Sequence, residues 1–91
     1  MVEVHYEKVY FSGFVQGVGF RYTTLQVARE FEVTGVVANL ADGRVQLEIE
    51  GASRTVSAFV AAVEERMHGF IRKVERTSEK RAAQFSDFRI Q

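Results

Sequence analysis

The chain has 91 residues, of which 46% are hydrophobic and 12% aromatic, enough apolar material for one hydrophobic core. Its twelve basic and twelve acidic side chains cancel, so the net charge does not favour binding to nucleic acid or to an anionic membrane. The absence of cysteine excludes disulfides, thiolate nucleophiles and sulfur-ligated metals. We therefore expect a single domain over residues 1–91, in which any anion is bound locally.

No segment has the pattern of a secretion signal or of a membrane span. The first residues lack a basic start with a long apolar run, and no apolar stretch approaches the roughly 18 residues that cross a bilayer. We expect a cytoplasmic protein with no membrane partner. His5 and His68 lie far apart and outside any metal-binding spacing, so we expect neither to be catalytic and expect no metal or other cofactor.

The first half of the chain predicts a strand, a glycine-rich loop, a helix and a second strand. Aromatic and β-branched residues are frequent from about Val4 to Ser12, as in a strand. Apolar residues then recur at helical spacing up to about Val33, which predicts a helix along one apolar stripe. The stripe consists of Phe20, Thr24, Val27, Ala28 and Phe31. The short apolar run Gly35–Asn39 predicts the second strand.

A hairpin and a second helix are predicted next. The Asp-Gly pair at 42–43 predicts a turn into a strand whose apolar residues alternate from Val45 to Ile49. Apolar residues at helical spacing follow, with Ser53 as candidate N-cap and with Arg66, His68 and Gly69 as a favourable helix end. The apolar positions of this helix are Val56, Phe59, Val60, Val63 and Met67.

The C-terminal third predicts a further strand, an irregular segment and a short last strand. Phe70–Val74 starts the fourth strand, and the charged segment Glu75–Arg81 predicts a solvated turn or a ragged edge. The last apolar residues, Phe85, Phe88 and Ile90, predict the final strand. This order is typical of an α+β, ferredoxin-like βαββαβ sandwich: an antiparallel sheet with two helices on one face and a short C-terminal strand. Since that fold hosts many activities, function must be inferred from a site.

The segment Gly13–Arg21, between the first strand and the first helix, is a candidate anion site. Its three glycines permit positive φ angles and a close approach of backbone N–H groups to a ligand. Arg21 adds a forked cation at a helix start, where free N–H groups already favour an anion. A cation is unfavourable there unless an anion is present, so we expect a phosphate or carboxylate to bind.

Two nucleotide-binding motifs do not match this loop. Its glycine spacing differs from the dinucleotide fingerprint, and no acidic residue follows in a strand about 20 residues on. The triphosphate loop needs Lys and then Ser or Thr after its last glycine, where this chain has Phe20 and Arg21. With both motifs excluded, the loop is predicted to bind a phosphate group that is not part of a nucleotide.

Two motifs and the C-terminal segment resemble the acylphosphatase family. The first motif, Gly-x-Val-Gln-Gly-Val-x-Phe-Arg, is complete from Gly13 to Arg21. The second, with that family's glycine and asparagine spacing, is formed by Gly35, Asn39, Gly43, Val45 and Gly51. Phe85–Phe88 is similar to the family's C-terminal aromatic strand. The chain departs from the family at Val36, where an aromatic residue is usual, and at Ala38, where a polar or basic residue is usual.

The resemblance implies an acylphosphatase that needs no cofactor. Arg21 is expected to bind the phosphate and Asn39 to position the attacking water. The phosphate cradle would be completed by the loop N–H groups of Val15, Gln16, Gly17, Val18, Gly19 and Phe20. The implied partners are a small acyl phosphate as substrate and inorganic phosphate as product and competitor. We expect a monomer that binds no nucleic acid.

The chemistry of these residues is consistent with that activity. An asparagine amide can orient a water but cannot act as a general base near neutral pH, so the substrate must already be reactive. An acyl phosphate meets this condition because its carboxylate leaving group needs no general acid. A loose phosphoryl transition state then requires positioning and charge stabilisation.

Three alternatives stay open. Asn39 alone could be a turn residue that bonds its own backbone. A non-catalytic module could bind phosphate or carbamoyl phosphate for regulation, although Arg21 and Asn39 argue against lost catalysis. An RNA-binding ferredoxin-like domain would stack bases on its central strands. The solvent-facing positions expected on the third strand, Gln46, Glu48 and Glu50, offer no stacking surface and would repel a phosphate backbone.

Overall fold

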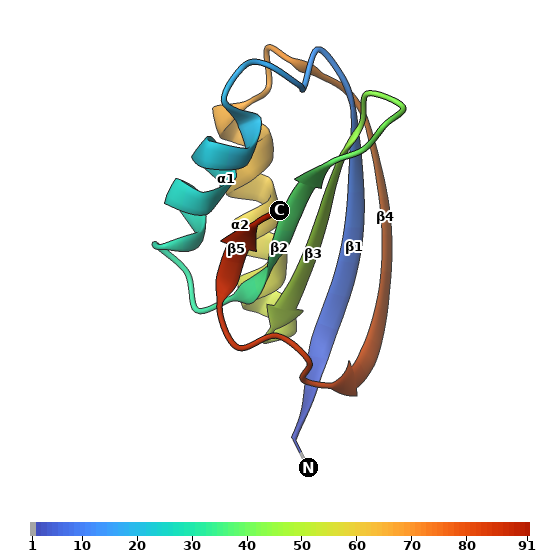
Figure 1. Ribbon diagram of the computed structural model, residues 1–91. Helices are drawn as coiled ribbons and strands as arrows, with labels where there is room; N and C mark the ends of the chain where they lie inside the picture. The colour runs from blue at the N-terminus through green and yellow to red at the C-terminus, as the bar shows by residue number, and fades with distance from the viewer. Residues whose placement is uncertain (1) are drawn as a thin grey trace.

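The computed structural model describes residues 2–91, which form one five-stranded sheet and two helices (Figure 1). In chain order the elements are β1 (Glu3–Gly13), α1 (Phe20–Ala28), β2 (Thr34–Asn39), β3 (Val45–Gly51), α2 (Ser53–Arg66), β4 (Ile71–Ala82) and β5 (Phe88–Ile90). The strands lie in the order β4-β1-β3-β2-β5. The ferredoxin-like arrangement is confirmed, but β5 runs parallel to β2, so the sheet is mixed and not wholly antiparallel.

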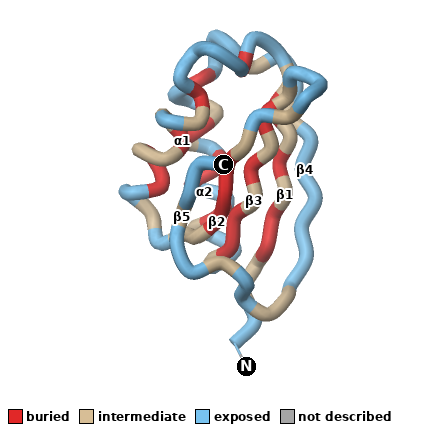
Figure 2. The backbone as a smooth tube through the Cα atoms, viewed as in Figure 1, coloured by how far each residue is buried: buried red, intermediate tan, exposed pale blue. Residues whose placement is uncertain are grey.

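Both helices pack on one face of the sheet, and the core lies between them and the central strands (Figures 1 and 2). Successive side chains of a strand point to opposite faces, so alternate residues of β1 and β3 enter this core. They are Val9, Phe11, Val45, Leu47 and Ile49, all fully buried, and they meet Val56, Phe59, Val60 and Val63 of α2. Neither helix is long and apolar enough to cross a membrane.

The two helices each differ from prediction at one end. α1 ends at Ala28 and not near Val33, because the next three N–H groups bond to carbonyl oxygens three residues back. Such bonds tighten a last turn and end the α-helical ladder. Phe31 still packs on the core, which explains why its position fitted the helical stripe. α2 begins at Ser53 with Ala52 as its N-cap, so Ser53 is not the cap.

β4 is longer than the sequence predicted. The charged segment Glu75–Arg81 forms no turn and continues the strand to Ala82. β4 pairs with β1 along its length and lies at the edge of the sheet. An edge strand has solvent on its outer side and does not need alternating apolar residues. Charged side chains there also discourage pairing with another sheet, so the polar sequence suits the position.

Glu50 is buried on the face of the sheet opposite the helices, where the sequence predicted a solvent-facing residue. Its side chain is covered by the chain between β4 and β5, and the residue is 2% exposed. The carboxylate accepts N–H groups of Gln84 and Phe85, each at 2.9 Å, and Nε of Arg81 at 2.9 Å. Burial alone would raise the pKa of Glu50, but these bonds from Phe85, Gln84 and Arg81 together hold its pKa below the usual range.

Glu50→Gln should lower the free energy of unfolding near pH 7 by about 2–3 kcal/mol, because it removes a charged acceptor from three donors. The pKa of Glu50 is depressed in the folded chain. Its stabilisation is therefore complete above the unfolded pKa of about 4.3 and is lost as the pH falls through the folded pKa. Urea unfolding of parent and variant should thus show a difference that shrinks in acid. Glu65→Gln, which removes an exposed carboxylate on α2, is the control; a pH-independent difference for Glu50→Gln would contradict this account.

Candidate active site

The loop over residues 14–19 joins β1 to α1 and is shaped by two glycines. Gly17 and Gly19 both have a φ of 78°, in the left-handed region that glycine adopts without steric cost. A Cβ at either position would meet no other atom within 4 Å, so the backbone angle and not a lack of space favours glycine here. Gly19 is also the N-cap residue of α1, and its carbonyl oxygen accepts the N–H of Thr23 at 2.9 Å.

The main-chain N–H groups of this loop are without protein partners. Within residues 2–91, none of the N–H groups from Val15 to Phe20 donates a hydrogen bond. The last of them belongs to the start of α1, where the helix dipole adds to the attraction for an anion. Unpaired N–H groups along a loop and at a helix start are suited to binding phosphate. The groups that the sequence assigned to a phosphate cradle are therefore available.

A pocket of about 180 Å³ lies beside the loop. Its lining consists of Val15, Gly17, Gly19, Phe20, Arg21, Tyr22, Asn39 and Ile90. The fold thus brings Arg21 and Asn39, from α1 and β2, to one small space next to the free N–H groups. Arg21 is the charged residue of this lining. Ligand pockets are commonly about 300–1,000 Å³, so this one suits a small anion. Gln16 and Val18 of the loop are not part of the lining.

Arg21 extends from the first turn of α1 and is held by the residue after β5. Its Nη1 donates to the main-chain oxygen of Gln91 at 3.1 Å. The N–H of Gln91 in turn donates to the oxygen of Val37 in β2 at 2.9 Å. A guanidinium has five N–H donors, so others remain for a ligand. Sequence reasoning missed Ile90 and Gln91 at this site, since an apolar residue and a glutamine there match no motif.

Asn39 is the last residue of β2 and faces Val45 of β3 in the register. The residue is exposed, and across residues 2–91 its side-chain amide makes no hydrogen bond with another protein group. The turn that follows is instead supported by Asp42, whose carboxylate accepts the N–H of Arg44 at 3.1 Å. The alternative in which Asn39 bonds its own backbone therefore does not describe this structure. Its amide is free to meet a ligand or a water in the pocket.

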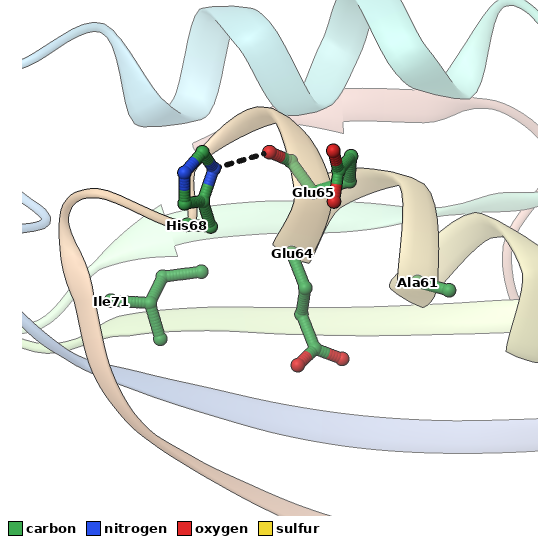
Figure 3. A pocket seen from close by; sticks show the side chains of 5 residues that line it. All are labelled: Ala61, Glu64, Glu65, His68 and Ile71. Carbon is green, nitrogen blue, oxygen red and sulfur yellow. Dashed lines mark hydrogen bonds between the residues drawn. The ribbon is translucent and has the colours of Figure 1, made fainter.

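A second pocket, of about 380 Å³, lies at the C-terminal end of α2 (Figure 3). His68 lines it, but its Nδ1 donates to the main-chain oxygen of Glu65 at 3.0 Å, a bond that helps to end the helix. The Glu64 carboxylate points away from the imidazole (Figure 3). No group of three His, Cys, Asp or Glu side chains in residues 2–91 is arranged to hold a metal ion. The lining of this pocket includes the carboxylates of Glu64 and Glu65, which do not favour an anion.

Comparison with known proteins agrees with the motifs and the fold. Residues 7–90 match the family model for acylphosphatase. An acylphosphatase of Archaeoglobus fulgidus is 52% identical over 56 residues, covering 62% of this chain and 63% of that protein, which is less than two thirds of its length. An acylphosphatase of Ligilactobacillus salivarius is 35% identical over 85 residues, covering 91% of this chain and 93% of that protein.

Solved structures show the same relationship. The crystal structure of acylphosphatase from Bacillus subtilis superimposes with a TM-score of 0.85 at 28% identity, covering 96% of this chain and 98% of that one. The family model includes the loop, Arg21 and Asn39. The chain belongs to the acylphosphatase family.

Proposed function

We propose that this protein hydrolyses the carboxyl–phosphate bond of small acyl phosphates, giving a carboxylate and inorganic phosphate. One observation carries the proposal: unpaired loop N–H groups, Arg21 and the free amide of Asn39 all border one small pocket. Membership of the acylphosphatase family supports it independently. The pocket's single charged residue suits a substrate whose main recognition element is one phosphoryl group.

The N–H groups from Val15 to Phe20 and the guanidinium of Arg21 hold the phosphoryl oxygens in this proposal. Both kinds of donor remain effective as charge spreads over those oxygens in the transition state. Gln91 restrains Arg21 before the substrate binds, through the 3.1 Å bond to Nη1. Because the donors are fixed in advance, little reorganisation is required during the reaction.

Asn39 orients the attacking water through its side-chain amide. The water oxygen bonds to phosphorus, the bond between phosphorus and the acyl oxygen breaks, and the electron pair leaves with the carboxylate. A phosphoryl oxygen of the substrate accepts the proton from the water, because an amide is not a base at neutral pH. The lining includes no carboxylate, thiol or imidazole to protonate a poor leaving group or to ligate a metal. We therefore expect little action on phosphomonoesters.

The open face of the sheet does not support the RNA-binding alternative. Its tyrosines are covered: the guanidinium of Arg81 lies 3.6 Å from the ring centre of Tyr6, and that of Arg44 lies 4.4 Å from that of Tyr10. Bases stack on exposed aromatic rings, and within residues 2–91 a guanidinium group lies over each of these two tyrosine rings. Glu48 adds negative charge beside them and accepts the Tyr6 hydroxyl at 2.7 Å. We propose a cytoplasmic monomer without a nucleic-acid partner.

Benzoyl phosphate should be hydrolysed at the same rate with and without EDTA, because no step in this scheme uses a metal. Inorganic phosphate should inhibit competitively, since it occupies the same N–H groups as the substrate. Steady-state kinetics with a phosphomonoester as the comparison substrate tests both points. Loss of turnover in EDTA that is restored by a divalent ion would overturn the scheme. Phosphate binding without any turnover would favour the regulatory module instead.

Substitutions of Arg21 and of Asn39 should impair phosphate binding and turnover in different ways. Arg21→Ala should lose phosphate affinity and turnover together, because Arg21 binds the phosphoryl group in both ground and transition states. Asn39→Ala should keep near-normal phosphate binding and lose roughly 10²-fold in kcat, the scale for one preorganised polar group. Phosphate titration by NMR and kinetics on the same samples measure both quantities. An Asn39→Ala variant that turns over at the parent rate would remove Asn39 from the mechanism.

Gly17→Val should weaken phosphate binding, because valine at a φ of 78° costs about 1–2 kcal/mol or more and the loop must deform to relieve it. Gly17→Asn should retain more affinity, since asparagine tolerates the left-handed region. Gly69→Val is a matched control at a glycine that is equally open but lacks a positive φ. Equal phosphate affinities for the Val and Asn variants of Gly17 would show that the left-handed angle is unimportant.

A further inference from the structure

We propose that a pocket on the open face of the sheet, the face opposite the helices, binds an aromatic carboxylate with a hydrogen-bond donor at the far end of its ring. Para-hydroxybenzoate is the simplest compound of this class. The pocket has a volume of about 330 Å³ and is lined by residues of β2, β3, β4 and β5 and of the segment between β4 and β5. This volume is within the range of small-molecule sites. The site adds a ligand to the proposed function and does not depend on it.

The floor of the pocket is a row of three residues on neighbouring strands (Figure 1). Val36 of β2 is paired with Glu48 of β3 on one side and with Arg89 of β5 on the other. Val37, the next residue of β2, is fully buried in the core, so the row lies on the open face. With strands about 4.8 Å apart, the main chains of Glu48 and Arg89 are separated by ~10 Å. An apolar centre thus lies between a carboxylate and a guanidinium.

The small side chain at position 36 leaves space for a ring. An aromatic residue is usual here in the acylphosphatase family, and this chain has Val36 instead. The second departure, Ala38, lies two residues on and so on the same face of β2. Phe85 and Ile90 add apolar walls to the pocket. Since aromatic rings pack against one another with favourable geometry, the ring of a ligand suits the space beside Phe85.

Arg89 supplies the anchor for the carboxylate. Its Nε lies 3.4 Å from Oδ1 of Asp87, in a pair whose side chains are 68% and 63% exposed. Such an exposed pair contributes little stability, so a ligand carboxylate can take the place of Asp87. The forked guanidinium matches a carboxylate with two N–H donors. Arg81 is already engaged, because its Nε and Nη2 both bond to Glu50, at 2.9 and 2.8 Å.

Glu48 determines the other end of the ligand. Its carboxylate accepts the Tyr6 hydroxyl at 2.7 Å and Nε2 of Gln46 at 3.2 Å. A carboxylate has about four acceptor sites, so it can also accept a bond from a ligand. Its negative charge disfavours an anion at this end of the row. The ligand therefore places its carboxylate at Arg89 and its donor at Glu48, with the ring over Val36.

The test is an NMR titration of the protein with para-hydroxybenzoate in saturating inorganic phosphate. The phosphate is needed because a carboxylate could also enter the loop, and Ile90 lines both pockets. Amide signals around Val36 and Arg89 should shift with a Kd of about 1 mM or tighter, while those of the loop stay unchanged. Para-fluorobenzoate, which lacks the donor, and para-hydroxybenzamide, which lacks the charge, should each bind about tenfold more weakly.

Two variants test the residues of the row. Val36→Phe places the chain's own ring in the pocket and should weaken the binding of para-hydroxybenzoate at least about tenfold. Arg89→Gln should weaken it about tenfold by removing the charge. Arg54→Gln is the matched control, because Arg54 is an exposed arginine on α2 and so on the other side of the sheet. Thermal unfolding shows whether each variant is folded, and Arg89→Gln and the two analogues decide the matter if Val36→Phe is not.

The outcomes separate this inference from the proposed function. Absence of binding at millimolar concentrations, or shifts confined to the loop and reversed by phosphate, would overturn the new site. Equal affinity of the parent and of folded Val36→Phe or Arg89→Gln would overturn it as well, and so would equal affinity for all three compounds. None of these measurements involves turnover. A protein that binds para-hydroxybenzoate as expected but does not hydrolyse benzoyl phosphate overturns the proposed function alone.

Discussion

The contact between Phe11 and Phe20 holds both ends of the candidate phosphate-binding loop in the core. Phe11 lies near the end of β1 and Phe20 is the first residue of α1; both are at most 2% exposed, and their ring centres lie 5.0 Å apart. Aromatic pairs in this geometry contribute beyond their buried area. With its ends fixed, the intervening chain must reverse over a short distance, which the left-handed angles of Gly17 and Gly19 allow. The unpaired N–H groups result from that reversal.

The position of Arg21 depends on contacts of Glu50 at the other end of the sheet. The Glu50 carboxylate accepts hydrogen bonds from the N–H groups of Gln84 and Phe85, and these bonds direct the chain from β4 toward β5. β5 then adds to β2 in parallel, which brings Gln91 within hydrogen-bond distance of Arg21. A buried carboxylate with three donors is stable only while all of them are present. The support of the arginine is thus linked to an ion pair on the opposite face of the sheet.

The candidate site offers mainly main-chain groups to a ligand and contains few reactive side chains. Loop N–H groups and one guanidinium supply positive potential without a metal ligand set in the lining, and one amide remains for the water. Such a site suits a reactive substrate with a good leaving group, since it provides position and charge stabilisation but no strong acid or base. The bonds from the Gln16 amide fall on main-chain carbonyl oxygens, so they hold the geometry without adding charge.

The sequence by itself determined the glycine loop, the pairing of Arg21 with Asn39 as candidates, and the order of strands and helices. It could do so because these depend on local rules: φ preference, hydrophobic period and motif spacing. Only the tertiary structure decided the full length of β4, the burial of Glu50 and the partners of Gln16 and Gln91. β4 is an edge strand that pairs on one side only, so its sequence does not need the alternation of apolar and polar residues by which a strand is predicted. The other contacts join side chains to main-chain atoms distant in sequence, and every residue carries those atoms, so no residue type marks the partner.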